Sequence, residues 1–145
     1  MLTRFQTALL FALLILIVVP MLAQTPGDLR RQYGPPDEKG RYTVRNGILL
    51  STRLEHGRIR EMAIKPQDPI TSQSSGPNLI TEATAHEVLD ELVPPSQRGK
   101  HIRSIVFNAG LSEVDAEEYE HVTISIVRAN GAGTGIASAG IRFKE

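Results

Sequence analysis

The chain contains no cysteine among its 145 residues, and this absence excludes several kinds of chemistry. Thiol catalysis, iron–sulfur clusters and zinc sites built on thiolates all need cysteine side chains. Disulfide bonds, on which many small exported domains depend, are excluded as well. A bacterial lipoprotein carries its lipid on a cysteine, so the chain cannot be tethered to a membrane in that way.

Aromatic residues are also scarce, with four phenylalanines, three tyrosines and no tryptophan. Proteins that bind single-stranded nucleic acid stack bases on aromatic rings beside basic residues, and the chain has no such stripe. The 16 basic side chains are balanced by 16 acidic ones. We therefore expect no nucleic-acid partner. Basic residues outnumber acidic ones over residues 24–78, and acidic ones dominate over 79–145. Either the two halves neutralise each other within the fold, or the first half presents a basic surface to an anionic partner.

The N-terminal residues have the order of a secretory signal peptide. Arg4 is followed by an unbroken apolar run from Ala8 to Val19, and Pro20 ends the run shortly before Ala23. A membrane-spanning helix needs about 20 apolar residues, so this run is short for that role. We predict a signal peptide over 1–23 and export to the periplasm or the exterior. The alternative is a retained anchor over residues 5–23, which would make the protein a membrane-tethered accessory subunit.

The remaining residues, 24–145, are long enough for a single domain with its own core. Periodicity and turn residues predict an α+β fold in which antiparallel sheets of about six strands form two three-stranded meanders. A helix precedes each meander, and both helices pack on one face. The predicted helices are 27–34, capped by Asp28, and 81–93. The predicted strands are 41–45, 48–54, 58–64, 101–107, 119–129 and 136–144.

Two predicted segments separate these elements. Residues 65–78 are rich in proline and serine and are interpreted as a linker between half-modules at about 27–64 and 79–144. Residues 113–120 carry five acidic side chains and are interpreted as a solvated turn. The dipeptide Asn46-Gly47 predicts a type I′ hairpin turn.

The segment Leu29-Arg-Arg-Gln-Tyr-Gly-Pro-Pro36 and the meander after it resemble two groups of exported bacterial modules. These are the small outer-membrane-assembly lipoproteins and the β-lactamase-inhibitor-type domains, which also pair a short helix with an antiparallel meander. The chain departs from both groups in lacking cysteine. The resemblance therefore implies an exported α+β module and assigns no site residue.

The candidate binding site is a group of three arginines, Arg41, Arg45 and Arg53. Strict alternation from the Asn46-Gly47 turn places them together on one face of the first meander, where Arg58 or Arg60 could join them. The opposite, core-facing set is then Tyr42, Val44, Ile48, Leu50 and Leu54. Like charges on one sheet face repel, so an anionic ligand or nearby carboxylates should balance them.

No catalytic motif or cofactor fingerprint is present, so we predict a non-catalytic binding or envelope-associated module without a cofactor. Its partner is unidentified and could be an anionic envelope component or another exported protein. The alternative is a small exported hydrolase or metal-dependent enzyme, because His86 and Asp90 are four residues apart on a predicted helix. Such a site would also need His101 and His121 to converge on them within metal-ligand distance.

Overall fold

A computed structural model describes residues 24–67, 79–129 and 135–145 of the chain. The predicted signal peptide and most of the predicted linker lie outside the described residues. Their assignments therefore stay predictions.

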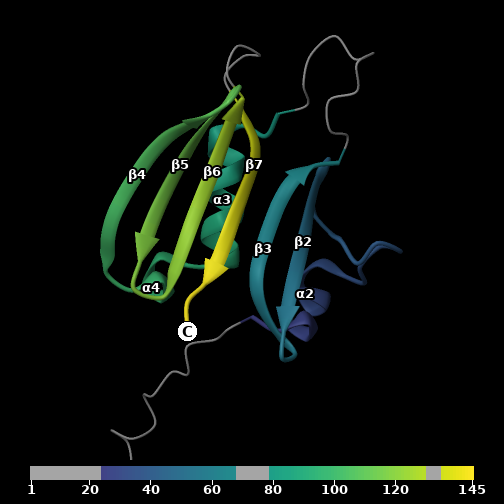
Figure 1. Cartoon of the computed structure of the whole chain (residues 1–145). Helices are drawn as coiled ribbons and strands as arrows, with labels where there is room; N and C mark the ends of the chain where they lie inside the picture. The colour runs from purple at the N-terminus through teal and green to yellow at the C-terminus, as the bar shows by residue number, and fades with distance from the viewer. Residues whose placement is uncertain (1–23, 68–78, 130–134) are drawn as a thin grey trace, which may run out of the picture.

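The described strands form one antiparallel sheet of seven strands in the order β1-β2-β3-β7-β6-β5-β4 (Figure 1). β3 and β7 pair in the middle and join the two halves of the chain. This confirms the predicted α+β class with antiparallel strands. The predicted six strands in two three-stranded meanders are not confirmed, because the second half contributes four strands. The strands are β1 Tyr42–Arg45, β2 Ile48–Glu55, β3 Arg58–Pro66, β4 His101–Ala109, β5 Ser112–Tyr119, β6 Val122–Ala129 and β7 Ile136–Phe143.

The additional strand is β5, which includes most of the acidic segment predicted to be a turn. The small or apolar residues Val114 and Ala116 alternate with acidic ones, so the segment has the period of two that a strand requires. Its stability comes from its neighbours, since β4 and β6 pair with it on either side. Arg128 on β6 compensates part of its charge and lies 3.6 Å from the Asp115 carboxylate.

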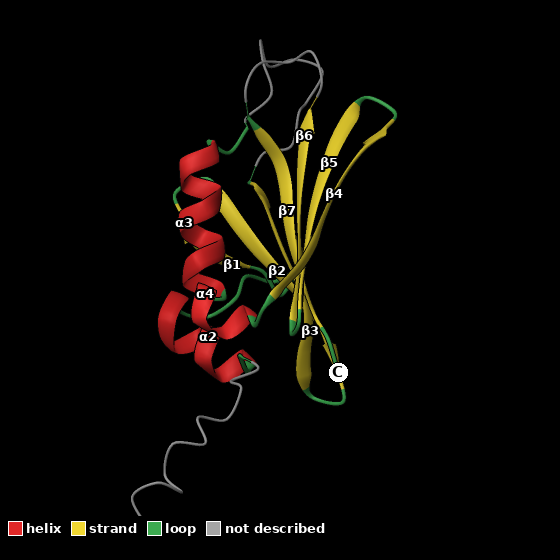
Figure 2. Ribbon diagram, turned by 90° about the vertical axis from the view of Figure 1, so that its left-hand side faces the viewer, coloured by secondary structure: helices red, strands yellow, loops and turns green. Residues whose placement is uncertain are grey.

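The helices lie on one face of the sheet and leave the other face open (Figure 2). They are α2 (Pro26–Tyr33), α3 (Glu82–Leu92) and the short α4 (Pro95–Arg98). α3 buries an apolar stripe at helical spacing, as its sequence predicted. The stripe consists of Ala85, Val88, Leu89 and Leu92. It packs into a core that includes Leu50, Ile64 and Ile136 from three strands.

The N-terminal cap of α2 differs from the prediction. Thr25 is the N-cap, and its side chain accepts a hydrogen bond from the backbone N–H of Asp28. The Asp28 carboxylate accepts a bond in return from the Thr25 backbone N–H, at 2.9 Å. This reciprocal capping box places Asp28 inside the first turn, with Pro26 as the first helical residue. Three hydrogen bonds, from Thr25 and Arg31, lower the pKa of Asp28 to about 2.

The type I′ turn of the first meander lies at its second turn and not at its first. At Asn46-Gly47 only Gly47 has a positive φ, so the predicted type I′ turn is wrong there. At the next turn, His56 has φ 51° and Gly57 has φ 77°, as type I′ requires. Each hairpin carries an irregularity next to its turn, between Thr43 and Arg45 and between Arg53 and Leu54. The extra residue is Val44 in the first hairpin, which turns Arg45 to the side of its partner Ile48, and Arg60 of β3 in the second.

Leu54 is the one member of the predicted core set that is exposed. Strict alternation predicts that it faces the core with Leu50, yet its side chain is 51% exposed while Leu50 is fully buried. The extra residue at this register shift is Arg60 of β3, so β2 keeps its alternation and Leu54 pairs with the buried Ile59. Leu54 is exposed because β2 extends past the core at this end, where Arg53 and Glu55 are exposed as well. The prediction for Leu54 is therefore wrong, and the other four members of the predicted core set are buried.

Candidate functional site

The three arginines of the predicted site do not share a face. The Arg41 side chain pairs with Asp37 just before β1, with an Nε to Oδ2 distance of 2.8 Å. Arg53 lies on β2, opposite Glu61 of β3, with 3.4 Å between Nη1 and Oε2. Arg45 instead contacts helix α3 on the other side of the sheet, because the irregularity in β1 reverses its direction. Each arginine has its own carboxylate, so the structure shows no shared cationic face.

Arg45 belongs to a small polar network that ties α2, β1 and α3 together. Its guanidinium lies 2.5 Å from Glu91 on α3, and Tyr33 and Gln32 of α2 each donate a hydrogen bond of 2.7 Å to the same carboxylate. Partial burial raises the pKa of Glu91, but the bonds from Arg45, Tyr33 and Gln32 outweigh it and the net shift is downward. Burial and the bond to Glu91 raise the pKa of Tyr33. This network has a structural role in fixing α2 to α3.

The four residues of the alternative metal site are dispersed. His86 lies 3.7 Å from Glu82 on its own helix, and Asp90 pairs with Arg98 of α4. His101 packs edge-on against the Tyr119 ring at 5.2 Å. In the part of the chain that the structure describes, no three His, Asp or Glu side chains are grouped so that they could hold a metal ion.

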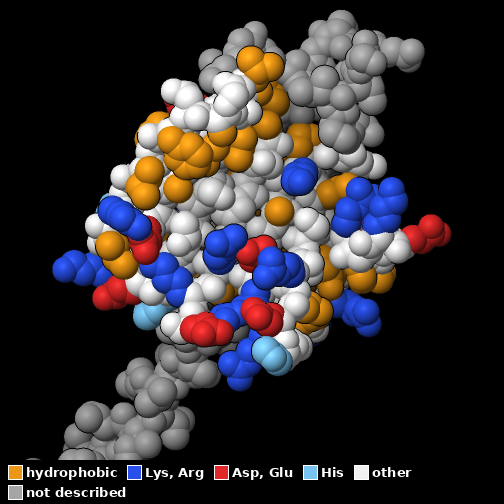
Figure 3. Space-filling view, viewed as in Figure 1, with side chains coloured by type: hydrophobic (Ala, Val, Ile, Leu, Met, Phe, Trp, Pro, Cys, Tyr) orange, Lys and Arg blue, Asp and Glu red, His pale blue; other side chains and the backbone are white. Residues whose placement is uncertain are grey.

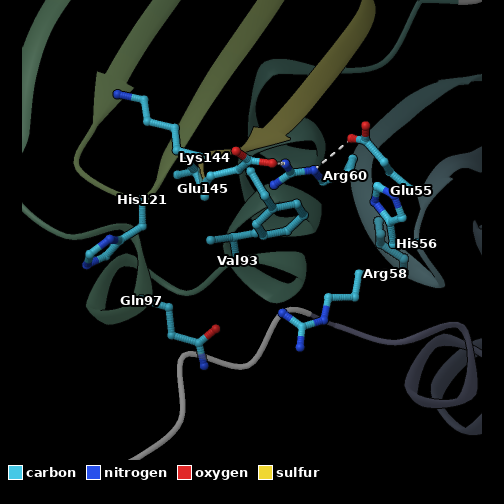
Figure 4. A pocket seen from close by; sticks show the side chains of 12 residues that line it. Glu55, His56, Arg58, Arg60, Val93, Gln97, His121, Lys144 and Glu145 are labelled. Atoms are coloured by element: carbon cyan, nitrogen blue, oxygen red, sulfur yellow. Dashed lines mark hydrogen bonds and ion pairs between the residues drawn. The ribbon is translucent and has the colours of Figure 1, made fainter.

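A pocket of about 620 Å³ opens at the end of the sheet, between the β2–β3 turn and α4 (Figure 4). We call it the end pocket. Its apolar floor comes from Ile59, Val93, Val122 and Phe143, which belong to the core or pack against it. Its polar rim consists of Glu55, His56, Arg58, Arg60, Gln97, His121, Lys144 and Glu145. An apolar floor with a few converging polar groups, at this volume, is typical of small-molecule sites.

Most charges at the rim already have a partner. Arg60 donates to Glu55 at 2.9 Å and also to Glu145. The bond from Arg60 lowers the pKa of Glu55 and, in return, raises that of Arg60, so the pair stays ionised. Lys144 donates to Glu118 at 2.7 Å. Arg58 differs, because no carboxylate in the described residues lies within ion-pair distance of its guanidinium.

Within the described part of the chain, the end pocket is therefore an apolar hollow with an arginine at its rim, Arg58, that has no carboxylate partner. The local conformation explains the position of Arg58: the tight His56-Gly57 turn places Arg58 opposite Glu55 at the start of β3. Sequence reasoning considered Arg58 only as an addition to the arginine face. No sequence pattern indicated the pocket, because its lining residues, among them Gln97, His121 and Lys144, come from segments far apart in the chain.

The open face of the sheet is a second surface with a distinct pattern (Figure 3). Register aligns one row of residues from β2 to β4 across the sheet. The row consists of Arg53, Glu61, Arg142, Thr123, Glu118 and Arg103. Glu61 accepts from Arg142 at 2.8 Å and Glu118 from Arg103 at 2.5 Å, so the two glutamates compensate most of the charge of the three arginines. Apolar side chains gather above this charged band in the view of Figure 3.

Comparison with known proteins adds no relative. A scan against protein families, a search of curated proteins and a search of solved structures each found no significant match to the chain. None of the helices in the described residues has the length and apolarity needed to cross a bilayer. The function is therefore argued from the geometry of the end pocket.

Proposed function

We propose that this protein is an exported, non-catalytic binding module whose end pocket takes a small amphipathic anion. The observation that carries the proposal is the position of Arg58, a cation without a carboxylate partner in the described residues, at the rim of an apolar floor. A guanidinium binds a carboxylate or phosphate through two parallel hydrogen bonds. The apolar part of the ligand would lie against Val93 and Phe143.

The charges around the pocket support an anion over a cation. The Glu55 and Glu145 carboxylates already accept bonds from Arg60 and are not free to bind a cationic ligand. Among the described residues of the rim, both carboxylates are bonded to Arg60, so neither is left unpaired to repel an anion bound at Arg58. The arginine-rich first half thus still supplies the recognition of an anion, but through Arg58 in place of Arg41, Arg45 and Arg53.

Titration of the exported protein with decanoate, a ten-carbon carboxylate, tests the proposal. Calorimetry should show binding, and the methyl NMR signals of Val93 and Val122 and the amide signal of Phe143 should shift. Arg58→Gln should weaken binding about tenfold, because a hydrogen bond to a charged group contributes on the order of 1.5 kcal/mol. The matched control is Arg31→Gln, whose side chain is 80% exposed on α2 and outside the pocket.

Two results would contradict the proposal. The first is equal affinity of Arg58→Gln and the unmodified protein for decanoate. The second is equally tight binding of methyl decanoate, which has the same chain without the negative charge.

Export is a separate part of the proposal and rests on the order of residues in 1–23. Mass spectrometry of the protein from its native host should find a mature chain that begins at Gln24. An intact precursor in a membrane fraction would instead support the tethered accessory subunit. An intact precursor in the soluble cytosol would contradict both assignments.

A further inference from the structure

Strand β4 lies at the edge of the sheet, where another strand could pair with it (Figure 1). All nine of its residues, His101–Ala109, are exposed. One side of β4 pairs with β5, and the other has no neighbouring strand in the described residues. Proteins protect edge strands by keeping them short or by adding proline, lysine or bulges. β4 is long, has neither proline nor lysine, and its only register shift is at its start, between His101 and Arg103.

β4 is also apolar on both of its faces. Ile105 and Phe107 lie on the open face and are 42% and 48% exposed. Val106 points to the helix side, where it is 62% exposed. The helices cover other strands, and no residue of β4 or β5 belongs to the buried core. In Figure 2 the far ends of β4 and β5 stand away from the helices. A strand added at this edge would therefore cover apolar side chains on two faces at once.

We propose that β4 pairs antiparallel with β4 of a second copy of this chain, with Val106 on the twofold axis. In this register Val106 faces Val106 of the second copy, and Ile105 faces Phe107 of the second copy on both sides of the axis. Ser104 then faces Asn108, and Arg103 faces Ala109. Every large apolar residue in 103–109 meets an apolar residue, and every polar one meets a polar or small one. Cross-strand pairs of this kind are what stabilise antiparallel sheets.

The charges of β4 fit a second copy. Arg103 is the only charged residue in 103–109, and Glu118 of β5 already neutralises it at 2.5 Å. Two copies can therefore approach without bringing like charges face to face. Registers centred on neighbouring residues fit less well: with Ile105 on the axis, Phe107 faces Arg103 and Val106 faces Ser104. Isologous pairing of this kind closes at two subunits, so it gives a dimer and no fibre. The proposal is independent of the end pocket, which β4 does not line.

The absence of cysteine makes a sharp test available, since any introduced cysteine is the only one in the chain. In an antiparallel pair, directly opposed residues have Cα atoms about 5.5 Å or less apart, within the range that a disulfide spans. Val106→Cys should therefore form a disulfide dimer under mild oxidation. An equal mixture of Ile105→Cys and Phe107→Cys should cross-link at least fivefold more than either variant alone. The matched control is Thr43→Cys, an exposed position on β1 at the opposite edge of the sheet.

Sedimentation of the unmodified protein supplies the second measurement. A single strand pair buries a small interface, so we expect dimers in the micromolar range and a shift to monomer on dilution. Ile105→Lys should sediment as a monomer at every concentration while keeping the circular dichroism of the parent. A Val106→Cys yield no higher than that of Thr43→Cys would overturn the proposal. Monomeric sedimentation of the unmodified protein throughout would overturn it as well, and would leave the edge to a strand from a different protein.

Discussion

The sharpest test of the fold compares two leucines on one strand, Leu50 and Leu54 of β2. Strict alternation places both on the core side of the sheet, but β2 extends past the core at its Glu55 end, so 51% of Leu54 is exposed while Leu50 is fully buried. Replacing Leu50 with alanine removes buried methyl groups and leaves a cavity among Ile64, Leu89 and their neighbours. Substitutions of this kind reduce the free energy of unfolding by about 2–5 kcal/mol.

The same substitution at Leu54 should cost far less. Full burial of a leucine side chain contributes about 1.5–3 kcal/mol to stability, and the Leu54 side chain is only about half buried. No cavity forms at an exposed position, so we expect a loss of roughly 1 kcal/mol or less. For a domain of this size, Leu50→Ala should lower the melting temperature by about 8 °C or more, and Leu54→Ala by about 4 °C at most.

Urea unfolding followed by circular dichroism measures both losses by linear extrapolation, provided that the m-values agree. Leu111→Ala, at a leucine that is 85% exposed, is the control for a fully exposed side chain. Equal losses for Leu50→Ala and Leu54→Ala would refute the reasoning. They would mean that Leu54 is as well covered by the core as Leu50.

Three further predictions concern the polar network, a helix cap and a turn. Glu91→Gln should reduce stability by about 1 kcal/mol at pH 7. Because the pKa of Glu91 is lowered in the folded protein, this loss should shrink as the pH falls through that pKa, and a loss that stays constant at every acidic pH at which the protein remains folded would contradict it. Thr25→Ala should cost about 1 kcal/mol through loss of the α2 cap, with Thr25→Ser restoring most of it in the same urea assay. Gly57→Ala should cost about 1 kcal/mol or more because Gly57 has φ 77°, and a neutral effect would show that the β2–β3 turn has another conformation.

Several elements could be predicted because their signals are local. The apolar stripe of α3 repeats at helical spacing, and Thr81 before it supplies the cap that the structure shows. The first three strands lie between glycine-containing turns, and their positions follow from those turns. Such features depend on residues within a few positions of one another, so the order of residues carries enough information to find them.

β5 was not predicted because its sequence is more acidic than that of an ordinary strand. In the fold, its pairing with β4 and β6 outweighs that composition. The expected grouping of the arginines is not observed because the extra residue Val44 in β1 turns Arg45 to the side of Ile48. Leu54 is exposed because β2 extends past the core. An irregularity of one residue leaves little trace in composition or periodicity, yet it exchanges the two faces of a strand.

The order of residues by itself determined the lack of thiol chemistry, the helix α3 and the hairpins of the first meander, and it is the basis for the predicted signal peptide. Only the tertiary structure decided the pairing of β3 with β7, the exposed edge at β4 and the end pocket around Arg58. The physical reason is distance along the chain. A pocket that joins residues 55–60 to 93–97, 121–122 and 143–145 exists only after the sheet has formed and the core has excluded water from its floor.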